Sequence, residues 1–78
     1  MKLFIKSGDT LCKFLTVNYS VDELTEKVEK FLPRIETQLC VSIDYLVCND
    51  EAILMCDSGI RPMIFEFICE IVKKELKN

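Results

Sequence analysis

The chain carries one hydrophobic pattern twice, and this repeat constrains its fold more than any other feature. In residues 1–32, two stretches with strand-like alternation flank a polar turn at Gly8-Asp9 and lead into an amphipathic helical segment. The same order returns in residues 41–76, where Asn49-Asp50 takes the place of that turn. Alternation with a period of two indicates half-buried strands, and apolar spacing of three and four indicates a helix. The sequence therefore predicts a ββα unit that occurs twice.

Length and composition place both units in one domain. The chain has 78 residues, of which 50% are hydrophobic and 29% charged, a balance typical of a folded globular domain. The hydrophobic sides of two hairpins and two helices can be buried together if the helices cover one side of a common sheet. We predict a single α+β domain over residues 1–78 in the order ββαββα, with a four-stranded, mainly antiparallel sheet and both helices packed on one face.

Local signals mark where the helices begin and end. Ser20 is followed three residues later by Glu23, the spacing of a capping box at a helix N-terminus. Pro33 lacks a backbone N–H and crowds the preceding turn, so the first helix either kinks there or ends nearby, and we expect its regular part to end near Leu32. Pro62 suits the first turn of the second helix, where its missing donor costs nothing.

The phase of alternation assigns side chains to the two faces of the sheet. A turn that pairs Lys6 with Leu11 places the lysines of the first hairpin on the outer face, because an unpaired buried charge is costly. The inner face of that hairpin would then hold Leu3, Ile5, Cys12 and Phe14. The second hairpin would direct inward Val41, Ile43, Tyr45, Val47, Ala52, Leu54 and Cys56.

This assignment leaves more apolar surface outside than a soluble monomer usually exposes. The surplus lies on the outer sheet face and on one flank of the second helix. The predicted protein interface comprises Phe4, Leu11, Leu15, Leu46, Ile53, Met55 and Phe67. We expect a homodimer, because lysines on the first hairpin could meet Asp44 and Asp57 on the second hairpin of a twofold-related copy. The alternative is that the phase is reversed and the face described as outer is the core.

Composition argues against several classes of partner. The net charge is −3 and no segment concentrates lysine or arginine, so we expect no direct contact with nucleic acid. No apolar run approaches the roughly 20 residues of a membrane-spanning helix. Lys6, Asp9 and Lys13 interrupt any signal-peptide core. We therefore expect a soluble, cytoplasmic protein.

Residues that carry chemistry are sparse. The chain has no histidine, and Gly8 and Gly59 are isolated rather than part of a phosphate-binding loop. Five cysteines are present, but the nearest lie eight residues apart, which does not match a zinc site. We predict reduced thiols, no catalytic residues, no metal and no cofactor.

The function expected from the sequence is that of a small non-catalytic protein that acts through protein–protein interaction, as a dimer. Small acidic proteins without catalytic motifs include inhibitors and regulators encoded by phages and mobile elements, and we expect a role of this kind. The alternative is a thiol-dependent redox protein or enzyme that uses Cys48 and Cys56. Rapid reaction of one cysteine near neutral pH would favour that alternative.

Overall fold

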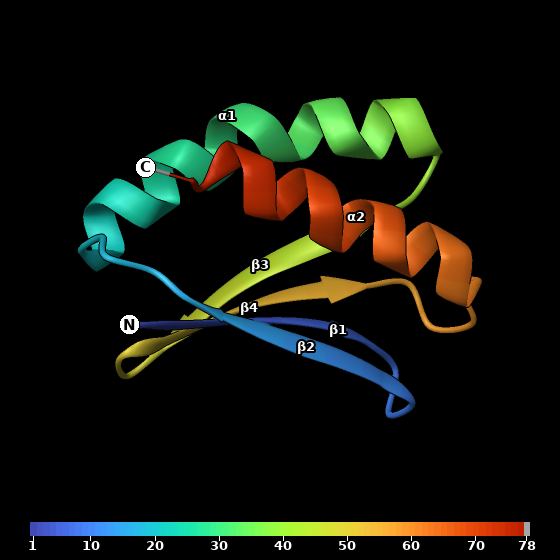
Figure 1. Cartoon of the computed structure of the whole chain (residues 1–78), viewed down its shortest axis with the longest axis horizontal. Coiled ribbons are helices and arrows are strands. Elements are labelled where there is room, and N and C mark those ends of the chain that lie inside the picture. The colour runs from blue at the N-terminus through green and yellow to red at the C-terminus, as the bar shows by residue number, and fades with distance from the viewer. Residues whose placement is uncertain (78) are drawn as a thin grey trace.

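The computed structural model describes residues 1–77 and shows six elements in the predicted order ββαββα (Figure 1). An α+β fold is therefore confirmed. The elements are β1 (Lys2–Ser7), β2 (Leu11–Thr16), α1 (Val21–Leu39), β3 (Ile43–Cys48), β4 (Glu51–Cys56) and α2 (Pro62–Glu75).

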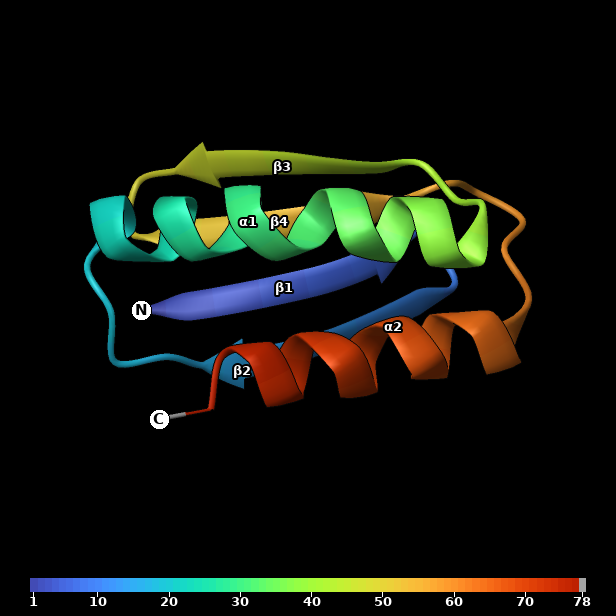
Figure 2. The same cartoon turned by 90° about the horizontal axis from the view of Figure 1, so that it is seen from above.

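The two hairpins join into one sheet with the strand order β2-β1-β4-β3. Each hairpin is antiparallel, and the two meet through parallel pairing of β1 with β4, so the sheet is mixed. Both helices lie over the same face of this sheet (Figures 1 and 2). The repeat is visible as two ββα segments, but their strands take different positions. The first strand of one hairpin and the second strand of the other occupy the centre.

The core lies between the sheet and the helices. The central strands direct Leu3, Ile5 and Leu54 into it, and all three are at most 1% exposed. The two helices bury residues at the same spacing, which reflects the sequence repeat. These residues are Leu24, Val28 and Phe31 on α1, and Phe65, Cys69 and Val72 on α2. Burial of this single apolar layer is the main source of stability of such a small domain.

The capping box at the start of α1 is confirmed. The Ser20 hydroxyl oxygen accepts from the Glu23 N–H at 3.2 Å, and a Glu23 carboxylate oxygen accepts from the Ser20 N–H at 3.1 Å. These two bonds satisfy two of the backbone donors that a helix N-terminus leaves without an intrahelical partner. They also hold the pKa of Glu23 below its ordinary value.

The predicted end of α1 near Leu32 is wrong, because the helix continues through Pro33 to Leu39. Pro33 lies on the exposed side of the helix, where water can hydrate the carbonyl that loses its partner. Beyond it, Ile35 is 1% exposed and packs into the core, which favours one further stretch of helix. The helix ends at Cys40, whose left-handed φ of 53° turns the chain away.

The predicted register of the first hairpin is also wrong, by one residue. Ser7, rather than Lys6, pairs with Leu11, so the connecting loop consists of residues 8–10. Three-residue loops are common in hairpins, and Gly8 adopts its left-handed φ of 57° without the steric cost that a side chain would add. The shift reverses every side chain of β2. The inner residues are therefore Leu11, Lys13 and Leu15, and the outer residues are Cys12, Phe14 and Thr16.

Two contacts explain why this register is stable. The buried Ser7 hydroxyl donates to the Asp57 carbonyl oxygen at 2.6 Å, which keeps Ser7 in the strand. Lys13 faces the helix side, but β2 is an edge strand, so its long side chain reaches past the core to the Glu66 carboxylate on α2 at 2.6 Å. The assumption that a lysine cannot lie on the inner face therefore does not hold for an edge strand.

The second hairpin follows the predicted phase. Cys48 pairs with Glu51 across a two-residue turn, and Asn49 adopts a left-handed φ of 56°. As a consequence, Ala52, Leu54 and Cys56 are buried, whereas Ile53 and Met55 lie on the opposite face.

Candidate interaction surface

The sheet face that carries no helix is the candidate site, and we refer to it as the outer face. Its centre is a line of four apolar side chains, one from each strand, which we call the apolar row. Pairing places Phe14 beside Phe4, Phe4 beside Ile53, and Ile53 beside Leu46. Neighbouring strands are about 4.8 Å apart, so the row crosses the whole sheet over roughly 14 Å.

Two further rows with charged groups flank the apolar row. On one side, the strand order gives Thr16, Lys2, Glu51 and Cys48. On the other side, it gives Cys12, Lys6, Met55 and Asp44. The first hairpin therefore contributes both lysines of the outer face, and the second contributes both carboxylates. Lys13 and Asp57 were predicted to lie on this face. Lys13 lies on the opposite face, and Asp57 follows the end of β4, so neither residue belongs to these rows. The second carboxylate of the outer face is therefore that of Glu51.

The apolar row remains accessible to solvent. Phe14 is 59% exposed and Leu46 is 52% exposed at its two ends, while Phe4 and Ile53 are partly buried between their neighbours. The rings of Phe4 and Phe14 have centroids 6.0 Å apart. The amines of Lys2 and Lys6 lie 5.7 Å and 5.9 Å from the centroids of Phe14 and Phe4, respectively, within the range of a cation–π contact. The row therefore combines apolar area with fixed positive charge.

The structure divides the sequence-predicted interface residues among three places. The outer face brings together Phe4, Leu46, Ile53 and Met55. Leu11 and Leu15 lie on the opposite face, partly buried against the core, so their predicted placement outside is wrong. Phe67 lies on α2 and is 51% exposed, in the helix layer rather than on the outer face. Sequence reasoning missed Phe14, because a four-residue loop fits the same sequence and places Phe14 on the inner face.

The two thiols considered for redox chemistry are far apart. Cys48 pairs with Glu51 at the turn of the second hairpin, whereas Cys56 pairs with Ile43 at its open end. Five residues of strand separate these ends, about 17 Å, and the two side chains lie on opposite faces. A disulfide needs Cα atoms within about 7 Å. Cys48 and Cys56 of one chain therefore cannot form a redox pair.

The environments of these two thiols also differ. Cys56 is 3% exposed, and burial, with smaller contributions from Cys69 and Asp57, raises its pKa to about 11. Such a thiol is almost entirely protonated at neutral pH and is a weak nucleophile. Cys48 is exposed on the outer face. A thiol reaction would therefore have to depend on Cys48 without Cys56.

Within residues 1–77, no group of three or more Cys, Asp or Glu side chains is arranged to hold a metal ion. Neither of the helices described is long and apolar enough to cross a membrane. No family model, curated protein or solved structure matches the chain.

Proposed function

We propose that this protein is a non-catalytic binding protein that acts through its outer face and forms a homodimer there. The observation that carries the proposal is the apolar row, which crosses all four strands on a face that no helix covers. Exposed contiguous apolar surface on a small soluble domain is typical of an interface. Aromatic side chains such as Phe4 and Phe14 are enriched at such sites.

Charge complementarity supports a second copy as the occupant. Consider a twofold axis that runs along the strands, midway between two facing sheets and centred between β1 and β4. This axis places β1 over β4 of the second copy and β2 over β3. Each row of one copy then faces the same row of the second copy, with the strand order reversed. Lys2 faces Glu51 of the second copy, and the same contact occurs twice because of the symmetry.

The apolar rows also complement each other in this arrangement. Phe4 faces Ile53 of the second copy, and Phe14 faces Leu46, so large and branched side chains alternate across the interface. Two sheets packed in this way lie about 10 Å apart with strand directions within about 30° of each other. The helices remain on the outside, and the dimer has four layers.

The other axis that brings the outer faces together is unfavourable. A twofold axis across the strands reverses their direction and exchanges the two charged rows. Lys2 would then face Lys6 of the second copy, and Cys48 would face Asp44. Like charges opposite one another in an interface oppose association. The distribution of charge therefore favours the axis along the strands.

A charge-exchange experiment tests this arrangement. We expect Lys2→Glu and Glu51→Lys each to weaken self-association by about tenfold or more, because each change creates two repulsive contacts. An equimolar mixture of the two variants should restore dimers, since a mixed pair again places opposite charges face to face. Analytical ultracentrifugation of each variant and of the mixture measures this. Lys30→Glu and Glu29→Lys on exposed positions of α1 are matched controls and should leave association unchanged.

If the mixture forms no more dimer than either variant alone, the axis along the strands is incorrect. If neither variant alters association of a dimeric wild type, the outer face is not the dimer interface.

We further propose that the dimer acts as an inhibitor or regulator in the cytoplasm, of the kind that phages and mobile elements encode. Three of the five thiols, Cys12, Cys40 and Cys48, are exposed. A reducing compartment would keep such thiols unpaired. Affinity capture with the wild type and with Phe14→Glu, from the native host, tests this role. A target protein bound by both variants would show that target binding does not need the outer face.

A further inference from the structure

A groove runs along the seam between the edge strand β2 and helix α2, where the outer-face residues Cys12, Phe14 and Thr16 form part of its rim. It consists of two adjoining hollows of about 350 Å³ and 410 Å³, both of which are lined by Leu15 and Lys73. The floor of the first hollow includes Ile5, Leu15 and Cys69. We call these two hollows together the β2–α2 groove. They offer an elongated, partly apolar surface beside a strand.

The strand that borders the groove has a free edge. Within residues 1–77, β2 pairs with β1 alone, so one side of its backbone has no neighbouring strand. The other edge of the sheet differs, because side chains already occupy donors where the chain enters β3. Asp57 accepts from the Ser42 N–H, and Glu36 accepts from the Ile43 N–H, both at 3.0 Å. An open strand edge can pair with an extended segment of another chain.

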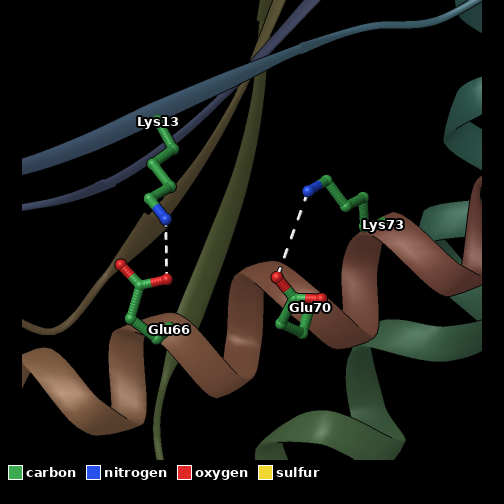
Figure 3. Close-up of polar contacts among 4 residues, drawn as sticks. All are labelled: Lys13, Glu66, Glu70 and Lys73. Carbon is green, nitrogen blue, oxygen red and sulfur yellow. Dashed lines mark hydrogen bonds and ion pairs between the residues drawn. The ribbon is translucent and has the colours of Figure 1, made fainter.

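The two ends of the groove differ in charge. At one end, Lys13 and Glu66 form a 2.6 Å ion pair that bridges β2 and α2 (Figure 3). Further along α2, the Lys73 amine lies 4.0 Å from the Glu70 carboxylate. At the other end, Lys73, Leu76 and Lys77 line the second hollow together with residues 15–18, and none of these described lining residues is acidic. This end is therefore basic.

We propose that the β2–α2 groove binds an extended, acidic segment of a partner protein, which adds to β2 as a fifth strand. Main-chain hydrogen bonds to the free edge would supply part of the affinity. An apolar side chain of the segment would fill the hollow over Ile5 and Cys69. A carboxylate would lie at Lys73 and Lys77. This site goes beyond the proposed dimer. It shares Phe14 at its rim with the apolar row, but the free edge of β2 and the lysines on α2 are observations that the dimer does not use.

A second copy of β2 fits this groove less well. Residues 11–16 contain a lysine and no acidic residue, so they offer no carboxylate to Lys73 and Lys77. The chemistry of the basic end therefore favours a different, acidic chain.

Titration of the ¹⁵N-labelled protein with two pools of degenerate hexapeptides tests the proposal. Both pools carry valine or leucine at alternate positions. One ends in aspartate with a free carboxylate, and the other ends in lysine amide. We expect the acidic pool to shift amide resonances of residues 11–18 and 66–77, with roughly fivefold tighter binding than the basic pool. The double variant Lys73→Glu/Lys77→Glu should reverse this preference, whereas Lys27→Glu/Lys30→Glu on α1 should retain it.

The proposal is overturned if neither pool shifts these resonances at millimolar peptide, if both pools bind equally, or if the shifts centre on β3. Concentration-dependent shifts confined to β2 in the absence of peptide would show that a second copy occupies the edge, which also overturns it.

Discussion

The two faces of the sheet are built from the same strands and similar residues, yet only one of them is a core. On β4, Leu54 points toward the helices and is 0% exposed, while its neighbour Ile53 points away from them. On the outer face, Phe14 and Leu46 leave more than half of their surface in solvent. The difference shows that helix placement decides which apolar residues this chain buries. The apolar row of the outer face resembles a core, but charged rows flank it, and neither helix within residues 1–77 covers it.

The largest effect should come from the inner face. We expect Leu54→Ala to lower the free energy of unfolding by about 2–5 kcal/mol, because it leaves a cavity in a fully buried site. In a domain of this size, such a loss approaches the total stability. Urea denaturation followed by circular dichroism measures it. A loss below about 1 kcal/mol would mean that the inner face is not closely packed.

Thiol reactivity compares the faces directly. Burial raises the pKa of Cys56 and of Cys69 from 9.0 to about 11, whereas Cys12 and Cys48 are exposed on the outer face. A shift of this size leaves about a hundredfold less thiolate at neutral pH. Alkylation of the Phe4→Glu variant, which we predict to be monomeric, with iodoacetamide near pH 7.5 should modify Cys12 and Cys48 before Cys56 and Cys69, as read by mass spectrometry. Equal rates for all cysteines would contradict the assigned faces.

The same thiols predict a dependence of stability on pH. In the unfolded chain they ionise near pH 9, but in the folded protein only near pH 11. The folded protein therefore binds more protons in this window, so the free energy of unfolding falls as the pH rises from 9 to 11. Replacement of both Cys56 and Cys69 by alanine should reduce this slope, measured by urea denaturation at several pH values. Replacement of Cys12 and Cys48 should leave the slope unchanged.

A smaller effect on the free energy of unfolding is expected at the N-terminus of α1, one of the two helices that cover the inner face. Ser20→Ala removes the capping acceptor of α1 and should lower the free energy of unfolding by about 1 kcal/mol. Ser58→Ala, at an exposed turn, is a suitable control. Thermal denaturation of both variants would show whether the capping box stabilises the helix that covers β3 and β4.

The smallest effect on folding should come from the outer face. In the dissociated monomer, we expect Ile53→Ala to lower the free energy of unfolding by about 1 kcal/mol, less than Leu54→Ala, because Ile53 is only partly buried and no helix packs over it. The same change should weaken the dimer, since Ile53 lies at the centre of the apolar row. If Ile53→Ala destabilises the monomer as strongly as Leu54→Ala, the distinction between the faces is incorrect.

The two hairpins show how far sequence reasoning reaches here. The Asn49-Asp50 turn sets the register of the second hairpin, so Ile53 and Met55 were predictable as outer residues. In the first hairpin, loops of three and four residues fit the same sequence. The assumption that no lysine lies on the inner face selected the four-residue loop, which is wrong. At an edge strand, Lys13 can face the helices and still reach the Glu66 carboxylate. That tertiary contact has no local sequence signal.

Other features depend on contacts between distant segments. Parallel pairing of β1 with β4 joins residues about fifty positions apart, and no local pattern specifies it. Continuation of α1 beyond Pro33 depends on burial of Ile35 in the assembled core. The candidate interface was therefore predicted only in part. Phe4, Leu46 and Ile53 follow from strand alternation, whereas Phe14 requires the observed register.

The central claim is that the outer face of this sheet binds a second copy. Sedimentation velocity of the wild type, Phe4→Glu and Phe67→Glu at micromolar concentration tests it most directly. We predict a dimer for the wild type and for Phe67→Glu, whose substitution lies in the helix layer, and a monomer for Phe4→Glu. A monomeric wild type at these concentrations would contradict the claim, as would a Phe4→Glu variant that remains dimeric.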